Sequence, residues 1–337
     1  MAISDYPRVP LAHTPTPLEA MPNLTRLLDG PALVVKRDDC TGLAMGGNKA
    51  RQLEFYFGEA QAQGADTVLI TGAVQSNFVR QTAAAAAKLG MACEIQLEHR
   101  VAATAPEYEV SGNVLLDRLL GAKIHYYPEG EDEAGADRAL EDIARRVRSE
   151  GGKPYVIHLS PGHPPLGSLG YVVGAGEILD QASEQDLVID AIVVPSGSGA
   201  THAGVVVGLR HRKSDIKVIG VCVRRGRDAQ FDRVFNQAQA AAEMVGLPIA
   251  ITKDDIHVTD DYLSPGYGQS SPGMLEAMTL AAREEGLLLD PVYTGKSMAG
   301  LIGLVRSGAF TAGQTVLYLH TGGTPALFGY ASMFDGL

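Results

Sequence analysis

The segment Gly46-Gly47-Asn48-Lys49 could form a covalent bond with a carbonyl compound. A lysine that follows a glycine-rich turn, on the first turn of a predicted helix, can attack an aldehyde once its amine is deprotonated. The two glycines would let the backbone approach a flat ring closely. A solvated lysine at a helix start is the alternative interpretation of so short a motif.

A second segment, Ser196-Gly197-Ser198-Gly199-Ala200-Thr201, could bind a phosphate. It follows a predicted strand and opens a predicted helix, where backbone N–H groups and the helix dipole attract anions. The P-loop spacing of nucleotide-binding proteins is absent, and the third glycine of a dinucleotide turn is missing. A plain strand-to-helix turn remains the alternative. A nucleophilic lysine and a phosphate turn in one chain together predict pyridoxal 5'-phosphate, an aldehyde that carries a phosphate.

Three further loops carry polar side chains that could complete such a site. Ser76 and Asn77 follow a predicted strand, where open α/β sheets bind ligands, although either residue could simply cap a helix. Tyr293 could lie against a ring and Thr294 could bond a pyridine nitrogen, unless Tyr293 is a core aromatic residue. Tyr267, between two glycines, offers a second tyrosine.

Other polar residues have simpler interpretations. The nine histidines show neither an HExxH motif nor another paired ligand spacing, so we predict no metal site. Asp38 and Asp39 beside Lys36 and Arg37 are typical of a structural ion-pair cluster. The pair His99-Arg100 follows a predicted strand and could meet an anionic substrate, but we expect it at a solvated strand end.

The composition excludes several classes of partner. The chain has 337 residues, of which 28 are basic and 39 acidic, giving a net charge of −11. This charge argues against nucleic acid or an anionic membrane as the main partner. No basic and apolar leader opens the chain, no apolar run is long enough to cross a bilayer, and the three cysteines form no CxxC pattern. We therefore expect a cytoplasmic protein with buried free thiols.

The elements that must position these loops alternate along the chain. Short runs rich in β-branched residues predict strands, and alanine-rich or amphipathic stretches of ten or more residues between many of them predict helices. Such alternation is typical of βαβ units and parallel sheets. The predicted strands are 67–71, 93–97, 123–127, 154–159, 189–195, 218–223 and 315–320, and the predicted helices are 75–89, 114–120, 134–150 and 169–183.

Two lobes are expected for a chain of this length. No linker stands out, so the glycine-rich turns near 45–50 and 160–168 are the best boundaries. The prediction is a small α/β domain over 52–160 and a large cofactor-binding domain that combines 1–51 with 161–337.

Several motifs together resemble one enzyme family. They are KRDDCTGLAMGGNKARQLEF, GAVQSN-x-VRQTAAAAAKLG, SGSGATHAG, PGYG, LDPVYTGKSMAGL and HTGGTPALF. The chain resembles the D-cysteine desulfhydrase and 1-aminocyclopropane-1-carboxylate deaminase family, which includes the L-cysteate sulfo-lyases, over nearly its whole length. This resemblance implies fold type II of the pyridoxal-phosphate enzymes, similar to the tryptophan synthase β subunit. It implies two parallel-sheet α/β lobes, the cofactor in the cleft between them, and a homodimer.

The resemblance also implies roles for single residues. Lys49 would hold the cofactor as a Schiff base, Asn77 would lie beside the phenolic oxygen, and Ser76 would meet the substrate carboxylate or take part in proton transfer. Tyr293 would flank the ring, with Tyr267 as a second active-site tyrosine and Thr294 as partner of the ring nitrogen. The phosphate cup would consist of Gly197, Ser198, Gly199, Ala200 and Thr201.

Three positions bear on the substrate. The stretch YTGKS has Thr294 where the cyclopropane deaminases have glutamate, and so resembles the desulfhydrase and sulfo-lyase branch. Phe78 stands where that branch usually has histidine. The loop 160–167, Ser-Pro-Gly-His-Pro-Pro-Leu-Gly, replaces its GGSN-x-x-G loop and resembles a deaminase stretch with HPLG.

The predicted function is β-elimination from a small β-substituted amino acid. The products would be pyruvate, ammonia and sulfide or sulfite, as in the D-cysteine desulfhydrases and L-cysteate sulfo-lyases. Three alternatives stay open: ring opening of a cyclopropane amino acid, racemisation of an amino acid, and amino-acid binding without catalysis. Neither the stereochemistry of the substrate nor the leaving group follows from the motifs.

Overall fold

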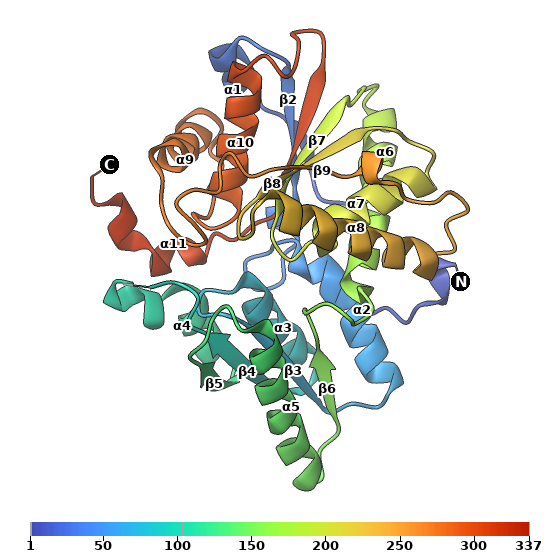
Figure 1. Cartoon of the computed structure of the whole chain (residues 1–337), viewed down its shortest axis with the longest axis vertical. Helices are drawn as coiled ribbons and strands as arrows, with labels where there is room; N and C mark the ends of the chain where they lie inside the picture. The colour runs from blue at the N-terminus through green and yellow to red at the C-terminus, as the bar shows by residue number, and fades with distance from the viewer. Residues whose placement is uncertain (1, 103, 337) are drawn as a thin grey trace.

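The strands of the protein form two separate sheets in a computed structural model that describes residues 2–102 and 104–336. One sheet contains, in spatial order, β1 (Leu18–Ala20), β2 (Ala32–Arg37), β10 (Thr315–His320), β7 (Ala191–Ser196), β8 (Lys217–Cys222) and β9 (His257–Thr259). The other contains β5 (Lys123–Tyr127), β4 (Ala92–Glu98), β3 (Thr67–Ala73) and β6 (Pro154–Ile157). Figure 1 shows the two sheets in two lobes, one above the other.

Neighbouring strands run parallel in both sheets, except that β1 pairs with β2 antiparallel. The predicted parallel sheets are thus confirmed with one correction at an edge. Residues 18–20 are too few to show a period, so the sequence patterns did not reveal this strand, and β2 and β9 were also missed. The strands of the smaller sheet all lie inside 52–160 and those of the larger sheet outside it. The exact domain boundaries stay a prediction.

Helices cover both faces of the larger sheet (Figure 1). One face carries α6 (Leu169–Glu184), α7 (Ala200–His211) and α8 (Arg227–Met244), and the other carries α1 (Pro22–Leu28), α9 (Pro272–Glu285) and α10 (Thr294–Arg306). The smaller sheet packs with α3 (Asn77–Leu89) and α5 (Glu133–Ser149), and α4 (Gly112–Leu119) lies against α3. This cover on both faces explains why central strands such as β3 and β7 are buried at every residue.

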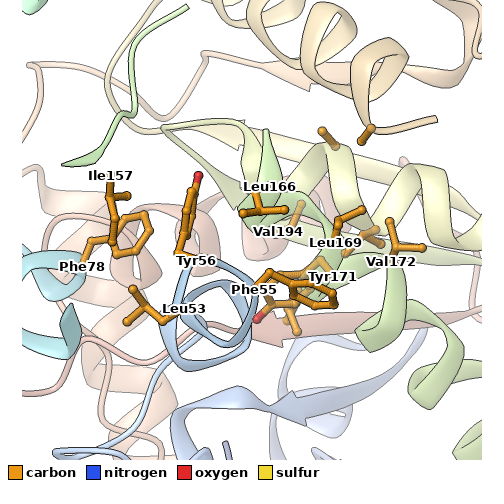
Figure 2. Packing of buried hydrophobic residues seen from close by; sticks show 14 of the residues in the cluster. Leu53, Phe55, Tyr56, Phe78, Ile157, Leu166, Leu169, Tyr171, Val172 and Val194 are labelled. Carbon is orange, nitrogen blue, oxygen red and sulfur yellow. The ribbon is translucent and has the colours of Figure 1, made fainter. Parts of the chain in front are cut away.

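Helix α2 (Lys49–Ala62) joins the two lobes. It contacts α3 of the small lobe and α6 of the large lobe, and most of its residues are buried. Figure 2 shows Leu53, Phe55 and Tyr56 of α2 packed between Phe78 and Ile157 on one side and Leu169 and Tyr171 on the other. A helix buried all round gives its first residue, Lys49, a fixed position.

The remaining helical segments are short. They are α11 (Ala326–Gly329) and the 3-10 turns Ile3–Asp5, Asp38–Cys40, Pro106–Glu109, Leu166–Ser168, Lys253–Asp255 and Ala331–Phe334. Within the described parts of the chain, no helix has both the length and the apolar character needed to cross a membrane.

A buried ion-pair network lies beneath Lys49 and confirms the predicted cluster at residues 36–39. Arg51 Nε donates to Asp38 Oδ2 at 2.9 Å, and its two terminal nitrogens reach both oxygens of Glu177 at 2.9 and 2.8 Å. Lys36 Nζ donates to Glu177 Oε1 at 2.6 Å. The side chains of Lys36, Asp38 and Arg51 are each about 1% exposed, so these charges compensate one another away from water.

The three cysteines are free thiols, as expected, but only two of them are buried. Cys93 and Cys222 lie on β4 and β8, whereas Cys40 is exposed at the end of a 3-10 turn. The prediction that Cys40 is buried is therefore wrong. Lys36 and Asp38 point into the ion-pair network, and the 3-10 turn Asp38–Cys40 carries Cys40 to the surface.

Candidate active site

A cavity between the lobes brings together most of the predicted site residues. The carboxyl ends of β3, β4 and β6 face it from one side and those of β7, β8 and β10 from the other, which is where α/β sheets bind ligands. The predicted residues that line it are Lys49, Ser76, Asn77, Gly197, Ser198, Gly199, Thr201, Tyr267 and Tyr293. Two predicted residues, Ala200 and Thr294, are not among those that line it.

The turn before Lys49 needs its glycines. Gly46 has φ +67°, and a Cβ on it would lie 1.9 Å from the carbonyl oxygen of Asp39. The Gly46 carbonyl accepts hydrogen bonds from the side chains of Arg80, at 2.8 Å, and Gln81. The Asn48 N–H donates to the Thr321 carbonyl at 3.0 Å. Residues of α3 and of the segment after β10 therefore hold this turn, and α2 can begin at Lys49 in one position.

The Lys49 amine lies over the ring of Phe78, with Nζ 4.9 Å from the ring centroid. Burial lowers the pKa of Lys49 to about 8. Among the described residues, Lys49 Nζ makes no hydrogen bond or ion pair. A desolvated amine without an anionic partner is readily deprotonated near neutral pH, as a nucleophilic lysine must be.

A second buried lysine, Lys296, has a structural role that contrasts with that of Lys49. Burial also lowers the pKa of Lys296 to about 8. Its amine, however, donates to the carbonyl oxygens of Leu263, at 2.7 Å, and Gly266. Lys296 thus anchors the segment that carries Tyr267, whereas Lys49 is free to react.

The predicted phosphate turn connects β7 to α7. Gly199 has φ +96°, a conformation that favours glycine. The Gly197 carbonyl accepts from Arg225 at 3.1 Å, and the Ser198 carbonyl accepts from Arg233 and Gln237 at 2.9 Å each. With these carbonyls held by side chains, the N–H groups at the start of α7 remain for an anion.

The Thr201 hydroxyl is arranged as a donor. Its oxygen accepts hydrogen bonds from the side-chain amides of Asn48 and Gln52, both at 2.8 Å. Because both lone pairs are then occupied, the hydroxyl can only donate its proton to a further partner. Thr201 lines the cavity, so a phosphate oxygen there would be a suitable acceptor.

Asn77 also presents a donor. Its Oδ1 accepts from Arg80 and from Asn113, both at 3.1 Å. The remaining NH₂ of Asn77 can donate to an oxygen in the cavity, as predicted for the phenolic oxygen of the cofactor. Ser76 caps α3 by accepting from the Val79 N–H at 3.3 Å, and its hydroxyl proton stays available.

Tyr267 and Tyr293 form a hydrogen-bonded pair, with their hydroxyl oxygens 2.7 Å apart. Their rings meet edge to face, at 77°. Burial raises the pKa of Tyr293 well above its ordinary value, and the neighbouring Tyr267 raises it further. Burial also raises the pKa of Tyr267, so both tyrosines stay protonated. One hydroxyl donates to the other, and the remaining proton is available for a group in the cavity.

Thr294 lies behind the cavity wall. Its hydroxyl donates to Asp290 Oδ1 at 2.7 Å and accepts from the Asp290 N–H at 2.7 Å. Asp290, which lines the cavity, also accepts from the N–H groups at the start of α10. The contact of Thr294 with the ring nitrogen stays a prediction, because its proton points at Asp290 in this structure.

Several lining residues escaped the sequence analysis. The clearest is Arg100, which was expected at a solvated strand end but pairs with Glu98 at 2.7 Å and lines the cavity. Across from it, Glu133 of α5 accepts from Arg224, Arg225 and Arg233 of the large lobe. The sequence feature that could have indicated a place in the cavity was the position of Glu98 and Arg100 at the end of a buried strand next to the predicted cleft.

The residues present fit a phosphorylated aldehyde of the pyridoxal type. Lys49 offers an unpaired amine, the start of α7 and Thr201 offer donors for a phosphate, and Asn77 offers a donor for a phenolic oxygen. A Cβ on Gly197 would approach the Tyr293 ring to 3.4 Å, so the missing side chain keeps room for a flat ring there.

Comparisons with known proteins agree with this cofactor. The family model "Pyridoxal-phosphate dependent enzyme" matches residues 9–322. D-cysteine desulfhydrases from Salmonella choleraesuis and Salmonella typhi are each 45% identical over 328 residues, covering 97% of both chains. A crystal structure titled as an ACC deaminase homologue superposes with a TM-score of 0.87 at 36% identity, covering 98% of this chain and 96% of that one.

A more distant structure shares the fold alone. A fungal L-serine ammonia-lyase from Rhizomucor miehei superposes with a TM-score of 0.65 at 21% identity, covering 93% of this chain and 94% of the other. The two-lobed arrangement is therefore common to chains of quite different sequence.

Proposed function

The chain belongs to the pyridoxal-phosphate-dependent enzyme family, and on this premise we propose that it eliminates hydrogen sulfide from D-cysteine. With water, the reaction yields pyruvate, ammonia and sulfide. The observation that carries the proposal is the desolvated Lys49 amine, without an anionic partner, in one cavity with the phosphate turn. The 45% identity to D-cysteine desulfhydrases over nearly the full chain supports the choice of substrate.

The cofactor, when bound, supplies an electron sink that makes the proton on the substrate α-carbon acidic. Lys49 would hold the cofactor covalently and, once displaced by the substrate amine, would accept that proton at Nζ. Its pKa near 8 suits proton transfer near neutral pH. Ser76 and the start of α3 would bind the substrate carboxylate through the hydroxyl and backbone N–H groups.

The tyrosine pair would assist the leaving group. Because both hydroxyls stay protonated, one can donate to the departing sulfur while the other stabilises the resulting oxygen charge through their 2.7 Å contact. Phe78 packs beside Lys49 and keeps that wall of the cavity apolar, which limits the access of water to the amine. Elimination is then favoured over exchange of the abstracted α-proton with solvent.

A substrate panel tests this proposal. Purified holoenzyme is incubated with D-cysteine, L-cysteine, L-cysteate, β-chloro-D-alanine and 1-aminocyclopropane-1-carboxylate, and keto acid, sulfide and sulfite are measured. We expect pyruvate and sulfide in equal amounts from D-cysteine. The similarity to the ACC deaminase homologue makes ring opening the second candidate, and 2-oxobutyrate without pyruvate would establish it in place of the first. The absence of any keto acid across the panel would contradict both.

Thr201→Val should weaken cofactor binding. The variant removes one donor to the phosphate and leaves the amides of Asn48 and Gln52 without an acceptor, so we expect a roughly tenfold higher dissociation constant. Titration of the apoprotein with pyridoxal phosphate, followed by absorbance, measures this constant. Thr279→Val on α9 is the matched control, because among the described residues that hydroxyl bonds only the Leu275 carbonyl within its own helix. Equal affinities of the two variants would argue against a phosphate at Thr201.

A homodimer and a cytoplasmic location belong to the same proposal. Exposed apolar side chains gather on two contacting helices, with Leu115 and Leu119 on α4 and Phe328 on α11. Such a patch is typical of a surface that a second copy covers. Three free thiols suit a reducing compartment. Sedimentation velocity measures the oligomeric state, and a monomer at micromolar concentration would exclude the homodimer. Cell fractionation measures the location.

A further inference from the structure

Three side chains from two segments meet at the edge of the active-site cavity. Asp137 lies in the second turn of α5, His158 follows β6 directly, and His163 lies in the loop after it. One potential ligand atom from each of them lies within 4.8 Å of the other two. Figure 1 shows α5 beside β6, which is what brings Asp137 to the histidines. We propose that Asp137, His158 and His163 bind a zinc-class divalent transition-metal ion.

The hydrogen bonds of His158 carry the proposal. Its Nε2 lies 3.0 Å from Glu141 Oε1, and a carboxylate there selects the tautomer with the proton on Nε2. The lone pair is then on Nδ1, which is buried, makes no hydrogen bond among the described residues, and lies 3.8 Å from Asp137 Oδ2. A lone pair facing a carboxylate oxygen across this distance is unfavourable, so either a proton on Nδ1 or a cation must lie between the two atoms, and a bound metal ion would take the place of that proton.

The distances suit a metal ion better than a hydrogen bond. Zinc bonds to nitrogen and oxygen of about 2.0–2.1 Å place two tetrahedral ligand atoms about 3.4 Å apart, close to the 3.8 Å between Nδ1 and Oδ2. A histidine whose other nitrogen bonds a carboxylate is the usual form of a zinc-binding histidine. Glu141 has this supporting position, and Ser160 likewise donates to the Asp137 carboxylate.

His163 would complete the protein ligands. Its ring stacks on that of His158, with centroids 3.9 Å apart and planes at 8°. Two parallel rings cannot both direct a lone pair at one ion, so His163 must turn out of the stack when the metal binds. Because its side chain is exposed in a loop, this rotation meets little resistance.

The ligand set indicates which class of ion binds and where its open coordination position lies. Two imidazoles and a carboxylate favour zinc and its neighbours over calcium or magnesium, which prefer oxygen ligands. Three protein ligands leave a fourth position open, as in catalytic rather than purely structural zinc sites. Asp137 and Ser160 line the cavity, so this position would face the cavity that binds the substrate.

Calorimetric titration of the full-length holoenzyme with zinc chloride tests the site. Titrations use a Cys40→Ser background, because the exposed Cys40 thiol would itself bind zinc. We expect one saturable site per chain. His163→Ala should weaken binding by at least about tenfold, and Glu141→Ala, which removes only the carboxylate behind His158, by about 10–100-fold. Cobalt bound at this site should give a visible absorption spectrum typical of low coordination number, and added zinc should abolish that spectrum by displacing the cobalt.

His211→Ala is the matched control, since His211 is an exposed histidine at the end of α7 and outside the cluster. It should bind zinc like the parent protein. Equal affinities of the His163→Ala and His211→Ala proteins would overturn the proposal, as would the absence of saturable binding in the parent. The readout does not depend on turnover, so a failure of the metal site is distinguishable from a failure of the proposed activity.

Discussion

Lys49→Ala should abolish covalent attachment of the cofactor and lower the rate of keto-acid formation by roughly 10³-fold or more, the scale on which the loss of a covalent catalytic group acts. Lys49 is the only lysine among the described residues that line the cavity, and it is proposed to serve both the covalent link and proton transfer at the α-carbon. Borohydride reduction of the holoenzyme, digestion and mass spectrometry should find the cofactor on the peptide that contains residue 49, and on no peptide of the variant.

Lys296→Gln is the matched control for this experiment. Lys296 has a similarly low pKa, caused by the same burial, but its amine is committed to two backbone carbonyls. Glutamine can still donate to them, so the variant should keep the covalent cofactor. A cofactor that remains attached in Lys49→Ala, or that is lost only in Lys296→Gln, would refute the assignment of Lys49.

Arg51→Met should lower the free energy of unfolding by about 3–5 kcal/mol, the cost typical of removing one partner from a buried ion-pair network. The variant leaves Asp38 and Glu177 with reduced compensation in a region closed to water. Urea denaturation near neutral pH, followed by circular dichroism, measures the change. Arg306→Ala breaks an exposed pair with Glu276 and should cost less than about 1 kcal/mol.

The pH dependence separates a charge effect from a packing effect. Burial alone would raise the pKa of Asp38, but the charge and hydrogen bonds of Arg51 outweigh it and hold this pKa below its ordinary value. The pKa of Glu177 is also lowered. Such groups stabilise the protein above their unfolded pKa, and this stability is lost as the pH falls through the lower folded pKa.

Without Arg51, burial dominates and raises the pKa of Asp38, so the variant should gain stability relative to the parent protein as the pH falls from 7 towards about 5. The gap between the two proteins should therefore be widest near neutral pH. A gap that is constant over this range would indicate lost packing instead of lost charge compensation.

Local features of the sequence were sufficient for much of the fold. Alternation of β-branched runs with helical stretches predicted all four strands of the smaller sheet and three of the larger one, because parallel strands buried on both faces have a strong composition signal. Lys49 and residues 197–201 were predicted as site residues for a similar reason. A turn that needs glycine at positive φ, as at Gly46 and Gly199, is visible in the sequence as glycines within a few residues of one another.

Other parts of the site depend on which segments meet. Arg100 was expected in solvent, yet it lines the cavity because β4 ends opposite the arginines of the large lobe. This position is not encoded by spacing alone, since it depends on how the two lobes pack against each other. The contact of Thr294 with the cofactor ring stays a prediction, because its hydroxyl bonds Asp290 in this structure.

The candidate lysine and the candidate phosphate turn were thus predicted from the sequence by itself, because backbone conformation and helix starts depend on neighbouring residues. The tertiary structure alone decided that Glu133 faces three arginines and that Asp137 lies beside His158 and His163. The physical reason is that these contacts join residues about 20 to 100 positions apart. Their geometry is set by the packing of α5 against β6 and against the opposite lobe, which no local pattern records.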